Sequence, residues 1–365
     1  MEKISVGILF GGVSTEHEVS RNSVSCVLRE IDGEKYKVKL FEITKKNGFF
    51  IYDVSFENLD AFCGEIKKTE NMLIKKKAEL SRAVFRENEV DVVFPLIHGT
   101  NGEDGTLQGF LELCDIPYVG CGVLSSALCM DKDMAKAVLR SRGIPQADHL
   151  CLTCDQIQEG MDDSISKAEG MFPYPMFVKP SSSGSSVGVS KAKDREGLRK
   201  SLDLASRLDR KILVEECIGG RELECAVYGN HTHAYASEPG EVIASNEFYD
   251  YNAKYVDGKS LTIVPADIPP ETGKRIQEYA LEAFRALDCY GLARVDFFLP
   301  ENGSPIMNEI NTMPGFTDIS MYPKLMARTG MAYRELIGNL IQLALEKKKR
   351  YTFTLDYEEV MRNEQ

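Results

Sequence analysis

The chain has 365 residues, of which 43% are hydrophobic and 27% charged, as expected of a globular protein with two or three domains. Its net charge is −12 and it has no long basic tract, so we expect no nucleic-acid partner. No apolar run is long enough to cross a bilayer, and the first ten residues turn polar too soon for a signal peptide, so no membrane association is expected. Ten scattered cysteines favour a reduced, cytoplasmic chain over a disulfide framework.

Strands alternate with helices in the first part of the chain. Apolar runs at Ile4–Phe10, Tyr36–Ile43 and Val90–Leu96 predict strands, and a helix is expected from about Glu16 to Arg29. This alternation predicts a doubly wound parallel sheet with its functional residues at the carboxyl ends of the strands. The segment Phe49–Leu80 is polar and irregular and carries no clear signal.

Two further units of mixed helix and strand are expected after a helix at Ser125–Arg142. The middle unit has predicted strands at Pro175–Pro180, Ser186–Ala192 and Lys211–Glu215. The expected domains and the acidic tail are 1–125, 126–215, 216–350 and 351–365.

Residues 293–311 predict two strands joined by a Pro-Glu-Asn-Gly turn. Side chains alternate along a strand, so Arg294 and Asp296 share one face, and Glu309 and Asn311 share a face of the partner strand. If the strands pair in register, two carboxylates, an amide and a guanidinium gather together. Such a group suits hard cations bound through oxygen, with Arg294 available to a developing anion. From this stretch alone, the solvated face of an edge hairpin is an equal alternative.

Two other stretches suggest a nucleotide site. In Phe177–Lys191 a strand ends near Lys179 and a Ser/Gly loop follows, whose small residues let backbone N–H groups approach an anion. No Walker loop is present, and a flexible turn is the plainer interpretation. Ile212–Glu222 enters a glycine link whose backbone could pair with an adenine edge while Glu222 holds ribose hydroxyls; the alternative is an interdomain linker.

Six segments together resemble the ATP-grasp ligases and, within them, the D-alanine–D-alanine ligase family. They occur in the order and at the approximate spacing of that family. They are GGVSTEHEVS at 11–20, HGTNGEDGTLQG at 98–109, MDK at 130–132, VKPSSSGSSVG at 178–188, EFYDYNAKY at 247–255 and ARVDF…NEINTMPGFT at 293–317. The resemblance implies an α/β chain with the ATP-grasp fold, in which a doubly wound N-terminal domain accompanies two α+β domains that clasp ATP.

The implied reaction is ATP-dependent ligation of two D-alanines through D-alanyl phosphate, giving ADP and D-alanyl-D-alanine for peptidoglycan, in a cytoplasmic homodimer. Two alternatives stay open: a sibling ligase that uses D-serine or D-lactate as second substrate, and a non-catalytic nucleotide-binding regulator. The intact lysines and acids of the motifs argue against the regulator. A dinucleotide oxidoreductase is disfavoured because no G-x-G-x-x-G follows the first strand.

The resemblance also implies roles for particular residues. Nucleotide contacts fall to Lys132, Lys179, Ser182, Ser183, Ser186, Val187, Glu215, Glu216, Ile218, Glu222 and, at the γ-phosphate, Lys254. Two magnesium ions, which manganese can replace, fall to Asp296, Glu309 and Asn311. Glu16, Ser185 and Tyr255 form a hydrogen-bonded trio, with Glu16 at the first ammonium group and His98 near the first carboxylate. Arg294 and the Gly315 N–H stabilise the oxyanion, Ser320 binds the second carboxylate, and Met321 favours D-alanine as second substrate. The loop at 245–258 is expected to act as a lid.

Overall fold

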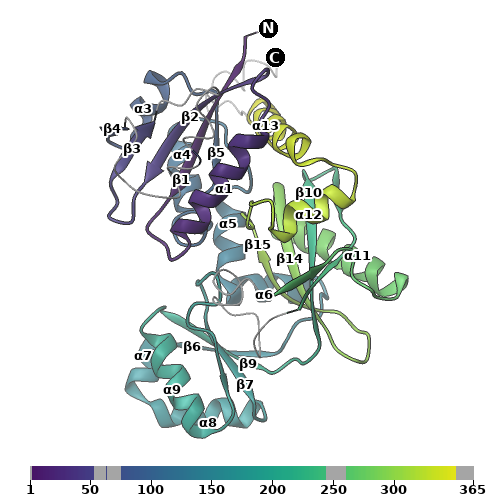
Figure 1. Cartoon of the computed structure of the whole chain (residues 1–365). Coiled ribbons are helices and arrows are strands. Elements are labelled where there is room, and N and C mark those ends of the chain that lie inside the picture. Colours follow the sequence, from purple (N-terminus) through teal and green to yellow (C-terminus); the bar gives the residue numbers. More distant parts are fainter. Residues whose placement is uncertain (1, 53–62, 64–74, 244–259, 351–365) are drawn as a thin grey trace, which may run out of the picture.

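The computed structural model describes residues 2–52, 63, 75–243 and 260–350. Within these ranges the chain forms three β-sheets, each covered by helices (Figure 1). No helix of the described part is long and apolar enough to cross a membrane.

The N-terminal sheet has the strand order β4-β3-β2-β1-β5. Its centre is parallel, made of β1 (Ile4–Gly11), β2 (Tyr36–Ile43) and β5 (Val92–Pro95), which confirms the predicted strands. Two short antiparallel strands, β3 (Phe49–Tyr52) and β4 (Lys75–Ala78), extend one edge, so the sheet is mixed rather than wholly parallel. The strand Lys75–Ala78 is short and lysine-rich and carries little hydrophobic pattern, whereas Phe49–Tyr52 is apolar, so the interpretation of 49–80 as polar and irregular was wrong at its start.

Helices cover both faces of this sheet, as the doubly wound prediction requires. Alternation along β1 sends Ile8 into a core with α1 (His17–Glu30) and the C-terminal α13 (Tyr333–Arg350). Leu9 points the other way, towards α3 (Arg82–Glu87) and α4 (Thr106–Leu113). The last helix of the chain therefore returns to the first sheet.

The predicted helix Ser125–Arg142 is instead two helices, α5 (Val123–Met130) and α6 (Lys132–Ser141). The break lies at Asp131, whose backbone is extended and whose carboxylate accepts the Met134 N–H at 3.2 Å as an N-cap. The break places Lys132 at the first position of α6.

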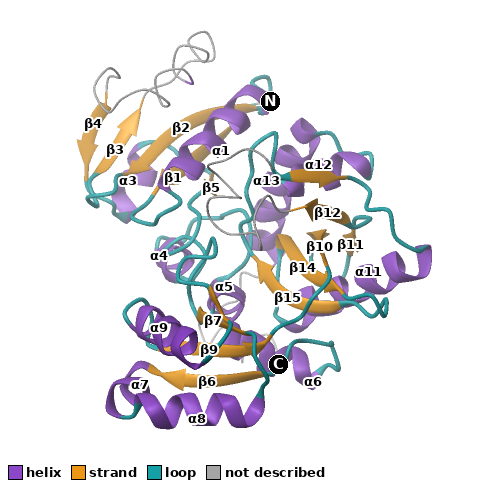
Figure 2. Cartoon of the chain, turned by 60° about the horizontal axis from the view of Figure 1, so that its bottom comes forward, coloured by secondary structure: helices purple, strands orange, loops and turns teal. Residues whose placement is uncertain are grey.

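The middle sheet is antiparallel, with the order β6-β9-β7-β8. Its strands are β6 (His149–Thr153), β9 (Lys211–Glu216), β7 (Met176–Pro180) and β8 (Ser190–Ala192). The covering helices are α7 (Cys154–Glu159), α8 (Met161–Met171) and α9 (Arg195–Ser206) (Figure 2). Strand β8 is shorter than predicted because residues 181–189 form a loop.

The C-terminal sheet has the order β13-β12-β10-β14-β15, with β11 paired to β10. Its strands are β10 (Arg221–Gly229), β11 (Ala234–Ala236), β12 (Gly240–Ile243), β13 (Leu261–Ile263), β14 (Gly291–Leu299) and β15 (Ile306–Asn311). Helix α11 (Pro270–Ala286) packs on one face, while α12 (Met321–Arg328) and α13 join this sheet to the core of the first. The hairpin of β14 and β15 pairs Arg294 with Asn311 and Asp296 with Glu309, which confirms the predicted register.

Candidate active site

A cavity of about 270 Å³ lies between the middle and C-terminal sheets. Strands β7 and β9 and the loop after β7 form one side, and β10, β14 and β15 form the other. The predicted site residues that line it are Lys132, Lys179, Ser183, Ser186, Glu215, Glu216, Ile218, Glu222, Asp296 and Glu309. Residues more than 170 positions apart in the sequence thus meet at one cavity.

Three carboxylates form a row across the C-terminal sheet. Glu224 on β10 is paired with Asp296 on β14, which is paired with Glu309 on β15, and all three line the cavity. Side chains directly opposite each other on antiparallel strands have Cβ atoms about 5 Å apart. Glu224 was not predicted, although alternation along β10 puts it on the same face as Glu222.

Arg294 lies among these acids. Its Nε and Nη2 each donate to one oxygen of Asp296 at 2.7 Å, and Nε is also 3.1 Å from Glu224 Oε2. Burial lowers the pKa of the guanidinium, but the charges of Asp296 and Glu224 outweigh burial and hold it well above its ordinary value. Asn311 donates its amide N–H to Asp296 Oδ2 at 3.0 Å. Arg294 is therefore a fixed cation.

The donor set for a cation is partial. Among the described residues, no group of three or more His, Cys, Asp and Glu side chains converges as a metal shell. Asp296 and Glu309 nevertheless supply carboxylate oxygens from neighbouring strands, and Asn311 adds an amide on the same face. Magnesium is commonly held by one or two carboxylates, with substrate phosphates and water completing its octahedron. These residues fit a cation that arrives with a phosphate.

A β-bulge re-aims one side chain that the sequence interpretation missed. The pairing shifts between Asp296 and Phe297, so that Asn308 is the extra residue of β15. Strict alternation would turn Asn308 away from Glu309, yet both line the cavity. The Asn308 amide oxygen is 3.4 Å from Lys179 Nζ.

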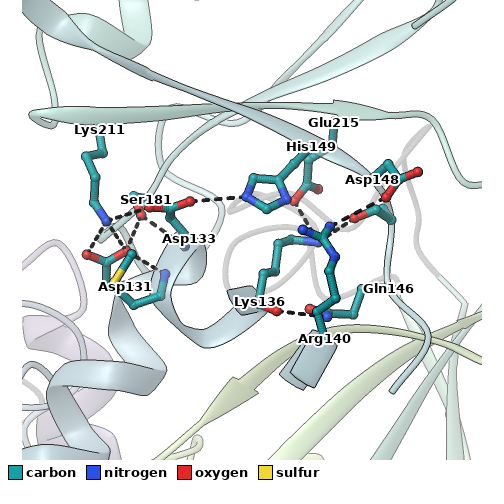
Figure 3. Close-up of polar contacts among 12 residues, drawn as sticks. Asp131, Asp133, Lys136, Arg140, Gln146, Asp148, His149, Ser181, Lys211 and Glu215 are labelled. Atoms are coloured by element: carbon teal, nitrogen blue, oxygen red, sulfur yellow. Dashed lines mark hydrogen bonds and ion pairs between the residues drawn. The ribbon is translucent and has the colours of Figure 1, made fainter. Parts of the chain in front are cut away.

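Glu215 is shared by two lysines, one of which was not predicted. Its Oε2 lies 2.7 Å from Lys179 Nζ. Its Oε1 lies 3.1 Å from Nζ of Lys136 on α6 (Figure 3). Lys136 also donates to the Ala147 carbonyl at 3.1 Å. Burial raises the pKa of Glu215, but the two lysines outweigh burial and hold it below its usual value. Burial lowers the pKa of Lys136. Lys136 shares no local motif with Glu215, and only the tertiary fold brings them together.

A second network fixes the start of α6 (Figure 3). Lys211 Nζ lies 2.6 Å from Asp131 and 3.0 Å from Asp133, while Ser181 Oγ donates to Asp131 at 2.8 Å. These contacts position Lys132, whose Nζ donates to the Ser183 carbonyl at 2.9 Å and lies 3.4 Å from Glu309 Oε2. Lys132 thus bridges the Ser/Gly loop and the acid row.

The Ser/Gly loop turns through two consecutive left-handed residues, Ser185 and Ser186, with φ of 51° and 58°. The Ser182 N–H donates to Asp209 at 2.6 Å, and the Val187 N–H donates to the Gly184 carbonyl at 3.1 Å. These bonds fix both ends of the turn.

Ser185 Oγ donates to the carboxylate of Glu16, which joins the loop to the N-terminal domain. Glycines leave room for this pair, because a Cβ on Gly99, at φ +72°, would lie 2.5 Å from Glu16 Oε2. Two members of the predicted trio therefore meet. The third, Tyr255, lies outside the described residues, as do Lys254 and the predicted lid at 245–258.

His98 is buried, and both ring nitrogens contact the protein. Nδ1 is 2.9 Å from the Met313 carbonyl, which can only accept, so Nδ1 carries the proton; Nε2 is 3.1 Å from Ser23 Oγ. Burial lowers the pKa of His98 although the Glu16 charge opposes it, so the ring is neutral at pH 7. His98 does not line the cavity.

Glu103 was not predicted, and it ties two loops together. Its carboxylate accepts the Gly99 N–H at 2.7 Å and the Met313 N–H at 3.0 Å. Burial and the neighbouring Glu16 raise its pKa to about 8, although the two backbone donors oppose the shift. The loop of His98 is thereby held against the loop that leads to Gly315.

The last predicted residues lie at the start of α12. Ser320 Oγ accepts the Thr317 N–H at 3.1 Å and lies 2.7 Å from Thr317 Oγ1, and a Cβ on Gly315 would lie 2.9 Å from the same Oγ. Met321 is buried, and its sulfur lies close to Gly240. Met321 itself belongs to the hydrophobic core that the first and last sheets share.

Two α+β units around a cavity lined by lysines and carboxylates, beside a doubly wound N-terminal domain, are the architecture of an ATP-grasp ligase. Family models described as D-ala D-ala ligase N-terminus and C-terminus match residues 5–121 and 138–342. The D-alanine–D-alanine ligase of Acetivibrio thermocellus is 48% identical over 95% of this chain and 97% of its own, and that of Ruminiclostridium cellulolyticum is 48% identical over 98% and 100%. The chain belongs to the D-alanine–D-alanine ligase family.

Solved structures agree. A D-alanine–D-alanine ligase from Coxiella burnetii superposes with a TM-score of 0.80 at 35% identity, covering 99% of both chains. A D-Ala:D-Ser ligase from Enterococcus faecalis superposes with a TM-score of 0.82 at 35% identity, covering 94% of this chain and 100% of the other. The ATP-grasp prediction is confirmed.

Proposed function

We propose that the cavity between the middle and C-terminal sheets binds ATP and is where D-alanyl phosphate forms. The overall reaction follows from the family: the chain is an ATP-dependent ligase that joins two D-alanines into D-alanyl-D-alanine, a peptidoglycan precursor, and forms ADP. The observation that best supports the proposed site is that Asp296 and Glu309 line the same cavity as Lys132 and Lys179, with Lys132 Nζ 3.4 Å from Glu309 Oε2.

Different parts of the cavity wall would contact the phosphates, the adenine and the ribose of ATP. Lys132 and Lys179 would offset phosphate charge, with the Ser182–Val187 loop beside them. The segment from Glu215 through Glu216 to Ile218 would hold adenine, and Glu222 the ribose hydroxyls. Lys254 would contact the γ-phosphate.

Magnesium would be held by Asp296, Glu309 and Asn311, as two ions that manganese can replace. When bound, it would neutralise phosphate charge and hold the γ-phosphate in line for transfer. Lys132, 3.4 Å from Glu309, adds positive charge at the same place.

In the first step a carboxylate oxygen of D-alanine attacks the γ-phosphorus of ATP, and the bond to the bridging oxygen breaks to release ADP. In the second, the amine of the other D-alanine attacks the acyl carbon, a C–N bond forms, the C–O bond to phosphate breaks, and phosphate and one amine proton leave. Glu16 would hold the first ammonium group with Ser185 and Tyr255 fixing it, and His98 would lie near the first carboxylate. Arg294 and the Gly315 N–H would stabilise the oxyanion, and Ser320 would bind the second carboxylate.

The second substrate is proposed to be D-alanine. Met321 offers an apolar, adaptable surface suited to a methyl group. A serine hydroxyl buried there without a partner would lose about 1–3 kcal/mol. The chain is further proposed to work in the cytoplasm as a homodimer.

An isotope experiment tests the acyl phosphate. D-alanine labelled with ¹⁸O in both carboxylate oxygens is incubated with the chain, ATP and magnesium, and the released phosphate is analysed by mass spectrometry. Attack by the carboxylate predicts one ¹⁸O atom per phosphate. Unlabelled phosphate would mean that water cleaves ATP, and the proposed pathway would be wrong.

A further inference from the structure

The oxygens of Asp296 are needed both by the guanidinium of Arg294 and by a bound cation. Arg294 takes both, at 2.7 Å each, and Asn311 donates to Oδ2 as well. A cation ligated by Asp296 must compete with the guanidinium for the same lone pairs. Arg294 must nevertheless remain in position, because its charge serves the second step of the reaction.

Glu224 supplies the alternative anchor. Its side chain is only 8% exposed, and its Oε2 already lies 3.1 Å from Arg294 Nε, the same nitrogen that donates to Asp296 Oδ1. The sheet fixes this arrangement, because Glu224 is opposite Asp296 in the register of β10 and β14, and Arg294 is two residues before Asp296 on the same face. A small turn of the guanidinium therefore exchanges one carboxylate for the other.

We propose that Glu224 is a positioning residue that keeps Arg294 in place when Asp296 binds a cation. The proposal rests on the cation role given above to Asp296 and Glu309. An uncompensated buried guanidinium would be costly, so without Glu224 the bond between Arg294 and Asp296 would have to persist. Glu224 thus makes Asp296 available, and its effect on the cation passes through Arg294.

The test measures cation binding directly. The dissociation constant of Mn²⁺ is measured by electron paramagnetic resonance with the imido analogue of ATP bound. Glu224→Gln is expected to raise it about tenfold, in the range of coupling between interacting sites. In an Arg294→Gln background the same change should have no further effect, because the competing guanidinium is gone. Glu224→Asp, which keeps the charge, should restore part of the affinity.

A matched control comes from the neighbouring strand β12. Glu241 is a buried carboxylate held by Arg221 at 2.7 and 2.6 Å, and it does not line the cavity. Glu241→Gln should lower stability without changing Mn²⁺ affinity.

Two results would show that the positioning role is wrong. In the first, Glu224→Gln binds Mn²⁺ as the unmodified chain does. In the second, Glu224→Gln loses as much affinity in the Arg294→Gln background, which would make Glu224 itself a ligand. Should Glu309→Gln also leave Mn²⁺ affinity unchanged, the cation site itself fails, which separates the two proposals.

Discussion

Asp296 on β14 lies directly opposite Glu309 on β15, and Lys132 at the start of α6 reaches Glu309 at 3.4 Å. The contact between Lys132 and Glu309 joins the two sides of the cavity, because Lys132 also donates to the Ser/Gly loop. Charge of both signs is thus fixed around one space before any phosphate enters, which lowers the reorganisation required during transfer.

Glu309→Gln is predicted to reduce turnover by about a hundredfold or more, because one anionic ligand is lost where phosphate charge must be offset. Phosphate release at saturating magnesium measures the effect, and circular dichroism checks the fold. Glu301→Gln, in the exposed turn of the same hairpin, is the control and should be neutral. Near-normal activity of the Glu309 variant would contradict the cation assignment.

Lys136→Met removes one of the two lysines that share Glu215. We expect a loss of about 1–3 kcal/mol in the free energy of unfolding, because a buried carboxylate loses a charged partner. The KM for ATP should rise, since Lys179 becomes the main partner of Glu215 and is less available to phosphate. Denaturant unfolding and ATP kinetics measure the two effects. Lys200→Met on the exposed face of α9 is the control. Unchanged stability and KM would show that Lys136 is dispensable.

Glu103 predicts a pH dependence of stability. Its pKa is raised from 4.5 to about 8 in the folded chain, so its contribution to stability is fully present below pH 4.5 and is lost as the pH rises through 8. The melting temperature of the unmodified chain, relative to that of Glu103→Gln, should therefore fall between pH 5 and pH 8. Thermal scans across this range measure it, with the exposed Glu87→Gln as control. A constant difference would mean that Glu103 does not titrate there.

Met321→Arg is predicted to move second-substrate preference from D-alanine towards D-serine, because the guanidinium gives the serine hydroxyl a partner. Met321 is buried beside Gly240, so some stability should also be lost. The ratio of kcat/KM values for the two amino acids is the measurement, since it is insensitive to the fraction of folded protein. An unchanged ratio would remove Met321 from the specificity pocket.

Part of the site could be predicted from local sequence pattern. Alternation along two strands was enough to place Asp296 and Glu309 together, and the same rule applied to β10 would have found Glu224. It failed at Asn308, because a bulge depends on packing across the sheet rather than on local sequence.

Contacts between residues far apart in the chain could not be predicted from local sequence. The sequence places Asp131 inside a predicted helix. In the structure it is an N-cap, because Lys211 and Ser181, which are distant in the chain, hold its carboxylate. Lys136 reads as an ordinary helical lysine until the middle sheet places Glu215 against it. Similarly, the hydrogen bond between His98 and the Met313 carbonyl could not be predicted, because the two residues are 215 positions apart in the sequence.

Product identity is the most direct test of the account. The chain is incubated with ATP, magnesium and equal concentrations of D-alanine, D-serine and D-lactate, and all products are measured together by mass spectrometry. We predict D-alanyl-D-alanine as the main product at neutral pH, with little D-alanyl-D-serine and negligible depsipeptide. Predominance of either mixed product would contradict the proposed second-substrate pocket, and ATP hydrolysis without any ligated product would contradict the ligase mechanism.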